Sequence, residues 1–190
     1  QYDDSLWMAK FGDPGFKYHA AAGRIGAAMV LRLANAPVVP YDYMEFARTM
    51  KTYLPAINDA LAARHWPSTM APVAASLDRF AAAAAGFDSA RDALLAGDPS
   101  RDVLTNTNAA LRNVERALTR PQGLENRTWF RNLIYVAEEY NGYANMVFPS
   151  VNEAIRAGDA DGTTREIADL AAHFDAATDA LNEARRATGR

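Results

Sequence analysis

The chain has 190 residues and a mass of 20.7 kDa, a size that fits one domain or one domain with an appendage. It contains no cysteine, which excludes disulfides, iron–sulfur clusters, thiolate zinc sites and a cysteine nucleophile. Twenty Lys and Arg against 23 Asp and Glu give a net charge of −3, which argues against nucleic acid as the main partner. The sequence contains no uninterrupted apolar run near the ~20 residues of a membrane-spanning helix.

Helical periodicity begins near the amino end. Asp13-Pro14 predicts an N-cap followed by the first helical position, and the helix continues to Asn35. Because this helix is apolar on nearly every side, we expect it to be the most buried element. The next helix is predicted to begin at Asp42, with Glu45 completing a capping box, and Pro55 is expected to kink it.

The same periodicity continues towards the carboxyl end. A third helix is predicted to stop at Gly97, and a fourth to run from Asp98-Pro99 to Pro121. The last is predicted to begin near Thr163, with Glu166 as its capping-box partner. Long amphipathic helices joined by short turns predict an all-α protein, an up-and-down four-helix bundle with extra short helices.

Residues 121–149 depart from this pattern. They contain many aromatic and polar side chains but no long helical stripe, and only 133–136 has a strand-like composition. Connections of this length are usually functional or disordered, and the aromatic content argues against disorder. We therefore expect a long irregular loop that forms the working surface. After it, Ser150 and Glu153 are predicted to cap a short helix that ends at Gly158.

The residue inventory does not indicate a self-sufficient enzyme, since zinc-helix, nucleophile-elbow and phosphate-loop motifs are all missing. His19, His65 and His173 lie far apart in sequence, and each is interpreted as a packed or surface histidine. Glu138 and Glu139 could be imagined as an acid–base pair, but adjacent residues project differently, so we expect one solvated and one structurally bonded carboxylate. No catalytic residue and no metal ligand is predicted.

A series of collinear motifs across nearly all of the chain carries a family resemblance. Together they resemble the transferrin-receptor-like dimerisation domain, the helical carboxy-terminal domain of the glutamate carboxypeptidase II and transferrin receptor family. The motifs lie at residues 11–19, 31–35, 40–43, 113–118, 121–124 (Pro121-Gln122-Gly123-Leu124), 130–135, 141–144 (Asn141-Gly142-Tyr143-Ala144) and 148–149.

The resemblance implies that the chain is part of a longer polypeptide, a bacterial zinc peptidase similar to N-acetylated-alpha-linked acidic dipeptidases. Residues 1–12 would connect from its peptidase domain, and 13–190 would form the helical dimerisation domain. The two zinc ions and the general base are expected in that peptidase domain, so this chain would hold no cofactor and would not be an enzyme alone. The implied partners are a second copy, forming a homodimer, and the parent's own peptidase domain. The compartment is left open.

The same resemblance points to Asn141, Gly142 and Tyr143 as substrate-binding residues. In the carboxypeptidases a Lys-Tyr pair helps hold the carboxylates of a terminal glutamate. Tyr143 matches the tyrosine, and its phenol could donate a hydrogen bond to a substrate carboxylate. Gly142 replaces the lysine and removes its charge, which argues against a preference for glutamate. The alternative for Tyr143 is a half-buried aromatic residue that closes the loop onto the bundle.

Two other interpretations stay open. The chain could be a non-catalytic interaction and dimerisation module, as in transferrin receptors, whose peptidase domain has lost its metals. It could also be a free-standing helical bundle with a coincidental match. Residues 121–149 argue against the second alternative, because an isolated bundle does not need such a segment.

Overall fold

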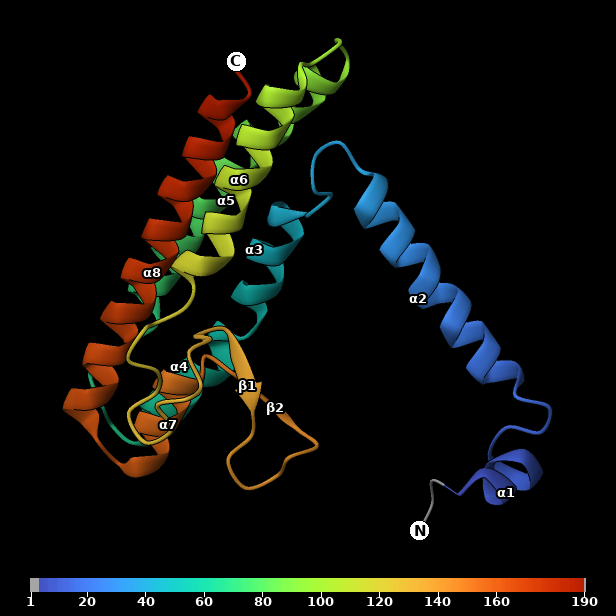
Figure 1. The fold of residues 1–190 in the computed structure, drawn as a ribbon. Coiled ribbons are helices and arrows are strands. Elements are labelled where there is room, and N and C mark those ends of the chain that lie inside the picture. The colour runs from blue at the N-terminus through green and yellow to red at the C-terminus, as the bar shows by residue number, and fades with distance from the viewer. Residues whose placement is uncertain (1–3, 190) are drawn as a thin grey trace. The chain divides into compact units, whose positions relative to one another are not determined.

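The computed structural model describes residues 4–189, which form a mostly helical fold with one small hairpin (Figure 1). The chain divides into two compact units, residues 1–40 and 41–190, called unit 1 and unit 2 below. Unit 1 contains one long helix, and unit 2 contains the helical bundle and the hairpin.

The described part of unit 1 consists of α1 (Ser5–Trp7), a π-helical turn (Met8–Gly12) and α2 (Lys17–Asn35). The prediction that α2 starts at Asp13-Pro14 is corrected, because the backbone turns at Phe16, whose φ is +54°. Asp13 still serves the helix start, since its buried carboxylate accepts hydrogen bonds from the backbone N–H groups of Tyr18 and His19 at 3.1 and 2.9 Å.

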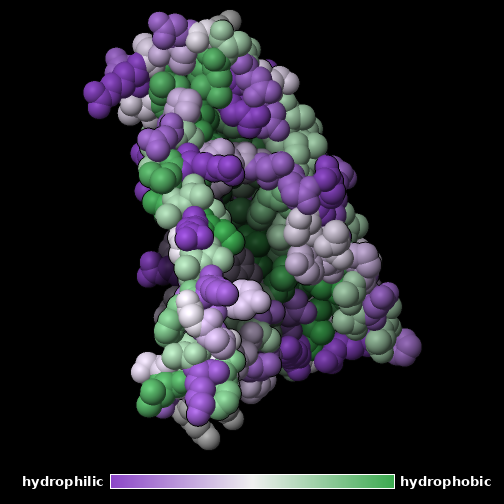
Figure 2. All heavy atoms as spheres, turned by 90° about the vertical axis from the view of Figure 1, so that its right-hand side faces the viewer, coloured by the Kyte–Doolittle hydropathy of each residue, from purple (hydrophilic) through white to green (hydrophobic). Residues whose placement is uncertain are grey.

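The expectation that this first long helix is the most buried element is wrong. All 19 residues of α2 are exposed, and Ile25, Val30 and Leu31 each expose more than 60% of their surface. The physical reason lies in unit 1 itself, whose described residues contain no second long helix to pack on α2. Figure 2 shows apolar side chains that reach the protein surface between hydrophilic ones.

Four helices form the bundle of unit 2: α3 (Tyr43–Thr52), α5 (Ala71–Leu95), α6 (Arg101–Ala117) and α8 (Ala160–Ala187). Their directions alternate along the chain, α3 and α8 pack against α5, and α6 packs against α8 (Figure 1). The shorter α4 (Leu54–Ala63) and α7 (Pro149–Ala157) lie at one end. The predicted all-α bundle with extra short helices is therefore confirmed.

Aromatic rings fill the centre of this bundle. Phe80 on α5 and Phe174 on α8 are fully buried, with ring centroids 6.5 Å apart in an edge-to-face arrangement. Tyr43 of α3 lies 6.0 Å from Phe80, and Phe148 lies 6.2 Å from Phe174. Such ring pairs contribute about 0.5–1.5 kcal/mol beyond the area they bury. Phe148 thereby fixes the end of the irregular segment 121–149 to the core.

Several predicted helix boundaries are confirmed. Asp42 caps α3 by accepting a hydrogen bond from the N–H of Glu45 at 2.8 Å. The helical run then breaks at Tyr53, and Pro55 lies in the first turn of α4, where its missing N–H is tolerated. The short helix α7 ends at Gly158, which adopts φ +75°.

The predicted starts of α7 and α8 are wrong. Ser150 lies inside α7 rather than at its N-cap, and Glu153 binds Arg127 instead of the helix backbone. The last helix begins at Ala160, not near Thr163, and Asp159 caps it. In both helices the predicted capping glutamate instead pairs with an arginine from residues 118–134, Glu153 with Arg127 and Glu166 with Arg120.

Residues 121–149 contain a small β-hairpin and the first residue of α7. Strands β1 (Tyr135–Ala137) and β2 (Asn145–Val147) pair antiparallel, with Val136 opposite Met146 and both side chains buried. The strand predicted at 133–136 is thus confirmed with a shifted boundary. The second strand was missed, because its short sequence has no alternating apolar pattern.

Gly123 is required at the start of this segment, and its replacement gives a first test. Its φ is +74°, and a Cβ atom there would collide with the backbone of Thr128. We expect Gly123→Ala to lower the free energy of unfolding by at least about 1–3 kcal/mol, from backbone strain alone. Denaturant titration of the variant measures this loss.

Gly142→Ala is the matched control, because a Cβ at that position would meet no atom within 4 Å and Gly142 does not adopt a positive φ. We expect its unfolding midpoint to equal that of the unmodified chain. Equal midpoints for both variants would contradict the assigned geometry of the 121–128 turn.

Candidate functional site

The three residues that the family resemblance singled out lie together at the connection between β1 and β2. This connection, residues 138–144, is called the hairpin turn below. It extends away from the short helices of unit 2 (Figure 1). Tyr143 is fully exposed at 104% of its reference surface, so the alternative of a half-buried ring that closes the loop onto the bundle is wrong. The turn carries the ring beyond the reach of the core.

Asn141 shapes the hairpin turn from within. Its side-chain oxygen accepts a hydrogen bond from the N–H of Tyr143 at 3.2 Å, and its carbonyl accepts one from Ala144 at 2.9 Å. The carbonyl of Ala144 in turn accepts the N–H of Glu138 at 2.9 Å. Asn side chains commonly stabilise turns in this way. In this structure Asn141 holds the backbone on which Tyr143 is presented.

Gly142 has no backbone reason to be glycine. It lies between Asn141 and Tyr143, is exposed, and a Cβ there would meet nothing within 4 Å. The position therefore accepts a larger side chain without strain. What glycine changes at this position is the chemistry of the tip, because residue 142 supplies no side-chain charge next to Tyr143 in the sequence.

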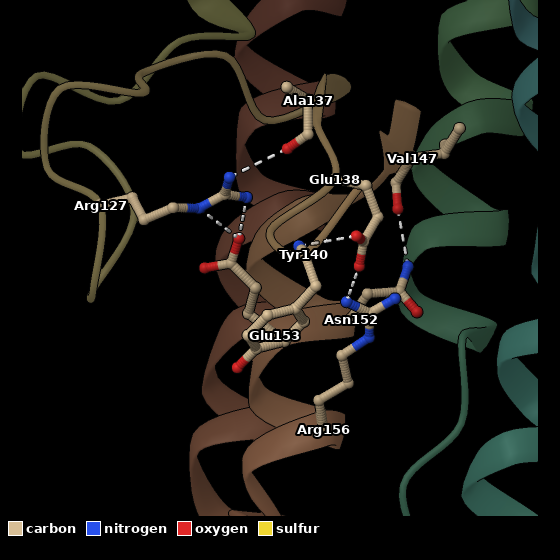
Figure 3. Close-up of polar contacts among 8 residues, drawn as sticks. All are labelled: Arg127, Ala137, Glu138, Tyr140, Val147, Asn152, Glu153 and Arg156. Carbon is tan, nitrogen blue, oxygen red and sulfur yellow. Dashed lines mark hydrogen bonds and ion pairs between the residues drawn. The ribbon is translucent and has the colours of Figure 1, made fainter. Parts of the chain in front are cut away.

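Glu138 connects the hairpin turn to helix α7. One carboxylate oxygen pairs with the guanidinium of Arg156, and the other accepts the N–H of Tyr140 at 2.7 Å (Figure 3). The hydrogen bond from Arg156 lowers the pKa of Glu138 below its ordinary value against the opposing effect of burial, and the N–H groups of Tyr140 and Asn141 lower it further. Glu138 is therefore held as a carboxylate.

The adjacent Glu139 is exposed. The prediction of one structurally bonded and one solvated carboxylate at this pair is confirmed.

A second, more deeply buried ion pair lies at the base of the hairpin turn, beside the end of β1. Both Nε and Nη2 of Arg127 contact Oε1 of Glu153 on α7, and Nη1 donates to the carbonyl of Ala137 at 2.9 Å (Figure 3). The Arg127 guanidinium also lies 4.8 Å from the ring centroid of Phe130. On the other strand, the side-chain amide of Asn152 donates to the carbonyl of Val147 at 2.6 Å. Both strands are thus tied to α7.

A groove of about 320 Å³ runs along one side of the hairpin. Ile57 and Met146 give it apolar lining, while Glu138, Asn152 and Arg156 give it polar groups. The Arg156–Glu138 pair therefore lies in the wall of this groove, where water or a bound molecule can reach the half-exposed guanidinium.

The histidines do not form a metal centre. Within residues 4–189, no group of three or more His, Asp or Glu side chains is arranged to hold a metal ion. His19 bonds the Asp13 carboxylate at 2.6 Å, and His173 bonds the carbonyl of Ala117 at 2.6 Å. Each of these two therefore has a local structural partner, in keeping with the sequence interpretation. Across the same residues, no helix has the length and apolar character needed to span a membrane.

Sequence reasoning missed the residues that support the hairpin turn. Arg127 and Glu153 are 26 residues apart, and Glu138 and Arg156 are 18 apart. No local spacing rule connects partners at these separations. Composition gave no signal either, because charged residues are no more frequent in 125–156 than in the whole chain.

Comparison with known proteins places this geometry in a family context. The model of the transferrin receptor-like dimerisation domain matches residues 68–182. A probable glutamate carboxypeptidase, LAMP1 of Arabidopsis thaliana, is 33% identical over 155 residues, which cover 81% of this chain and 22% of that protein. The inactive zinc metalloprotease C354.09c of Schizosaccharomyces pombe is 28% identical over 182 residues, or 92% of this chain and 23% of the relative.

A third relative, aminopeptidase NAALADL1 of Rattus norvegicus, is 24% identical over 155 residues that cover 80% of this chain and 20% of that protein. The chain thus spans about a fifth of the length of the curated relatives it matches. These findings confirm the resemblance stated from the sequence motifs.

Proposed function

The chain belongs to the transferrin receptor-like dimerisation domain family, and on that premise we propose that it dimerises and caps the substrate pocket of a zinc exopeptidase similar to glutamate carboxypeptidases. The observation that carries the capping role is the hairpin turn, which projects a fully exposed Tyr143 from a base of two ion pairs. An exposed aromatic residue on an anchored turn is suited to contact a ligand outside this chain.

The chemistry of the tip suits recognition rather than bond cleavage. The Tyr143 phenol donates one hydrogen bond, and a carboxylate acceptor makes that bond charge-assisted and stronger. Asn141 uses its side-chain oxygen on the backbone of Tyr143, so its amide NH₂ group remains as a second donor at the tip. A peptide's terminal carboxylate is the substrate group that these donors fit.

Hydrolysis itself is assigned to the parent's peptidase domain. The two zinc ions and the general base would lie there, since the histidine and carboxylate side chains of residues 4–189 form no cluster that fits a metal ion. This chain would accordingly bind no cofactor of its own. Its contribution would be to close the pocket and to fix the substrate's carboxylate end.

The partners proposed for this chain are a second copy and the parent's peptidase domain. The matched family is a dimerisation domain, and exposed apolar side chains on α2 supply surface that association can bury. Closed two-fold pairing is the commonest arrangement of soluble homo-oligomers. The proposal is therefore a homodimer.

A second candidate function is a dimerisation module without catalysis. The similarity to an inactive zinc metalloprotease over 92% of this chain favours it specifically. Peptide hydrolysis by the purified parent separates the two candidates: turnover that a chelator abolishes supports the capping role, and a folded parent without turnover supports the module.

Self-association tests the dimerisation half of the proposal. We expect light scattering of the full-length parent to give twice the mass of one polypeptide at micromolar concentration. This chain alone should also associate, more weakly if the peptidase domain contributes to the interface. A parent that stays monomeric across a wide concentration range would contradict the homodimer.

Removal of the Tyr143 hydroxyl tests the capping half. In the active parent, Tyr143→Phe should remove one charge-assisted hydrogen bond of about 1.5–3 kcal/mol, a roughly ten- to hundredfold loss in kcat/KM. Stability should stay the same, because the Tyr143 side chain is fully exposed. Steady-state kinetics on dipeptide substrates measure the loss.

Tyr140→Phe is the matched control, since Tyr140 is 84% exposed on the same hairpin turn but is not one of the three residues matched to substrate binding. We expect its kcat/KM to stay within about twofold of the parent's value. Equal kinetics for the Tyr143 and Tyr140 variants would mean that the hairpin turn does not touch substrate.

A charge placed at Gly142 tests selectivity. Gly142→Lys fits without strain and restores a cation beside Tyr143. We expect the ratio of kcat/KM for substrates with an acidic terminal residue to kcat/KM for neutral ones to rise, because opposite charges attract at short range. Gly142→Gln keeps a long polar side chain without the charge and should leave the ratio unchanged. An unchanged ratio in the lysine variant would contradict a pocket location for this residue.

A further inference from the structure

The hairpin is too small to hold its own shape. Each strand has three residues, and isolated two-stranded hairpins are marginally stable at best in water. Val136 and Met146 pack inward, but the hairpin turn beyond them is exposed from Glu139 to Tyr143. The order of the turn must therefore come from specific polar contacts at its base.

The contacts divide into two groups with different targets. Arg127 and Asn152 bind backbone carbonyls of Ala137 and Val147, which are the last residues of β1 and β2 at opposite ends of the hairpin. These contacts attach the strands to α7 and reach no residue of the hairpin turn. Glu138, the first residue of the turn, is bound by Arg156 of α7.

Glu138 transmits that attachment into the turn. Arg156 engages Oε1, which orients the carboxylate so that Oε2 accepts the N–H of Tyr140 at 2.7 Å. The Glu138 backbone N–H meanwhile donates to Ala144 at the other end of the turn. The Glu138 side chain therefore links helix α7 to the start of the turn, while the Glu138 backbone joins the two ends of the turn.

The exposure of the two ion pairs indicates what each can control. Arg127 and Glu153 are 10% and 9% exposed, whereas Arg156 is 47% exposed and Glu138 is 14% exposed. Breaking the deeply buried pair leaves an unpaired buried charge and endangers the fold. Removing Arg156 leaves the Glu138 carboxylate with the N–H groups of Tyr140 and Asn141 as partners, so the cost falls on the geometry of the turn.

We propose that Arg156 is a positioning residue that acts through Glu138 to hold the hairpin turn, and with it Tyr143, in the substrate-binding conformation. This inference rests on the proposed function. It assigns the outer ion pair to substrate affinity and the inner pair, Arg127 and Glu153, to folding.

The experiment uses the active full-length parent and the variant Arg156→Gln. We expect KM to rise about two- to fivefold, the range that loss of a partly exposed ion pair supports, with kcat within about twofold. Hydrogen exchange of the peptide covering residues 135–147 should accelerate, while exchange in α5 and α8 stays unchanged. Arg156→Lys keeps a cation that reaches one carboxylate oxygen and should recover most of the affinity.

The matched control is Arg79→Gln. Arg79 forms a two-pronged pair with Asp175 between α5 and α8, at 54% and 45% exposure, and neither residue belongs to the hairpin. This variant removes an arginine whose exposure is close to that of Arg156, and it should change neither KM nor exchange in 135–147. A KM increase of the same size in Arg79→Gln would overturn a specific role for Arg156.

The remaining outcomes separate this inference from the proposed function. Unchanged exchange of 135–147 in Arg156→Gln would overturn the positioning role whatever the kinetics show. Accelerated exchange with an unchanged KM, in a parent where Tyr143→Phe is impaired, would also overturn it. If Tyr143→Phe has full activity, the proposed capping function falls, and the inference that depends on it falls too.

Discussion

The buried Arg127–Glu153 ion pair is the contact on which the geometry of the candidate site depends. It joins residues 118–134, which contain no helix or strand beyond a single bridge, to helix α7. Nε, Nη1 and Nη2 of Arg127 all have acceptors, and the guanidinium lies against the Phe130 ring. A buried charge that is fully paired specifies one arrangement, because every alternative leaves a desolvated charge without a partner.

A second arginine, seven residues before Arg127, makes similar contacts. Arg120 contacts Glu166 and Asp169 of α8 at 2.8 and 3.1 Å and donates to the carbonyl of Gly123 at 2.9 Å. The irregular segment is thus fixed to α8 by Arg120 and to α7 by Arg127. These contacts explain how a long connection with six strand residues stays compact enough to support a projecting hairpin turn.

The helices could be predicted from sequence where local rules act alone. The Asp42 cap, the break before Pro55 and the end at Gly158 depend on neighbours within a few residues, and all are present. The starts of α7 and α8 were wrong because Glu153 and Glu166 bind arginines from a distant segment. A capping box and a long-range ion pair need the same glutamate, and the sequence pattern alone does not show which one forms.

The prediction that α2 is the most buried element was wrong for a related reason. An apolar helix was read as a core helix, but burial requires a partner, and unit 1 contains none among its described residues. The residues proposed to bind substrate on the hairpin turn were predicted from family resemblance and not from local sequence rules. Their exposure follows from the short strands that carry them. The ion pair between Glu138 and Arg156 could be found only in the structure.

Burial decreases stepwise from the base of the hairpin turn to its tip, and this gradient bears on the proposed function. The Arg127–Glu153 pair is almost fully buried, the Glu138–Arg156 pair is partly exposed to solvent, and Tyr143 is fully exposed. Electrostatic contacts weaken as solvent exposure grows, so the energy that opposes movement falls along the same path. The base therefore keeps its shape while the tip retains freedom to adjust. The proposed pocket-closing role needs both properties, since such an element must admit a ligand and then hold a defined donor against it.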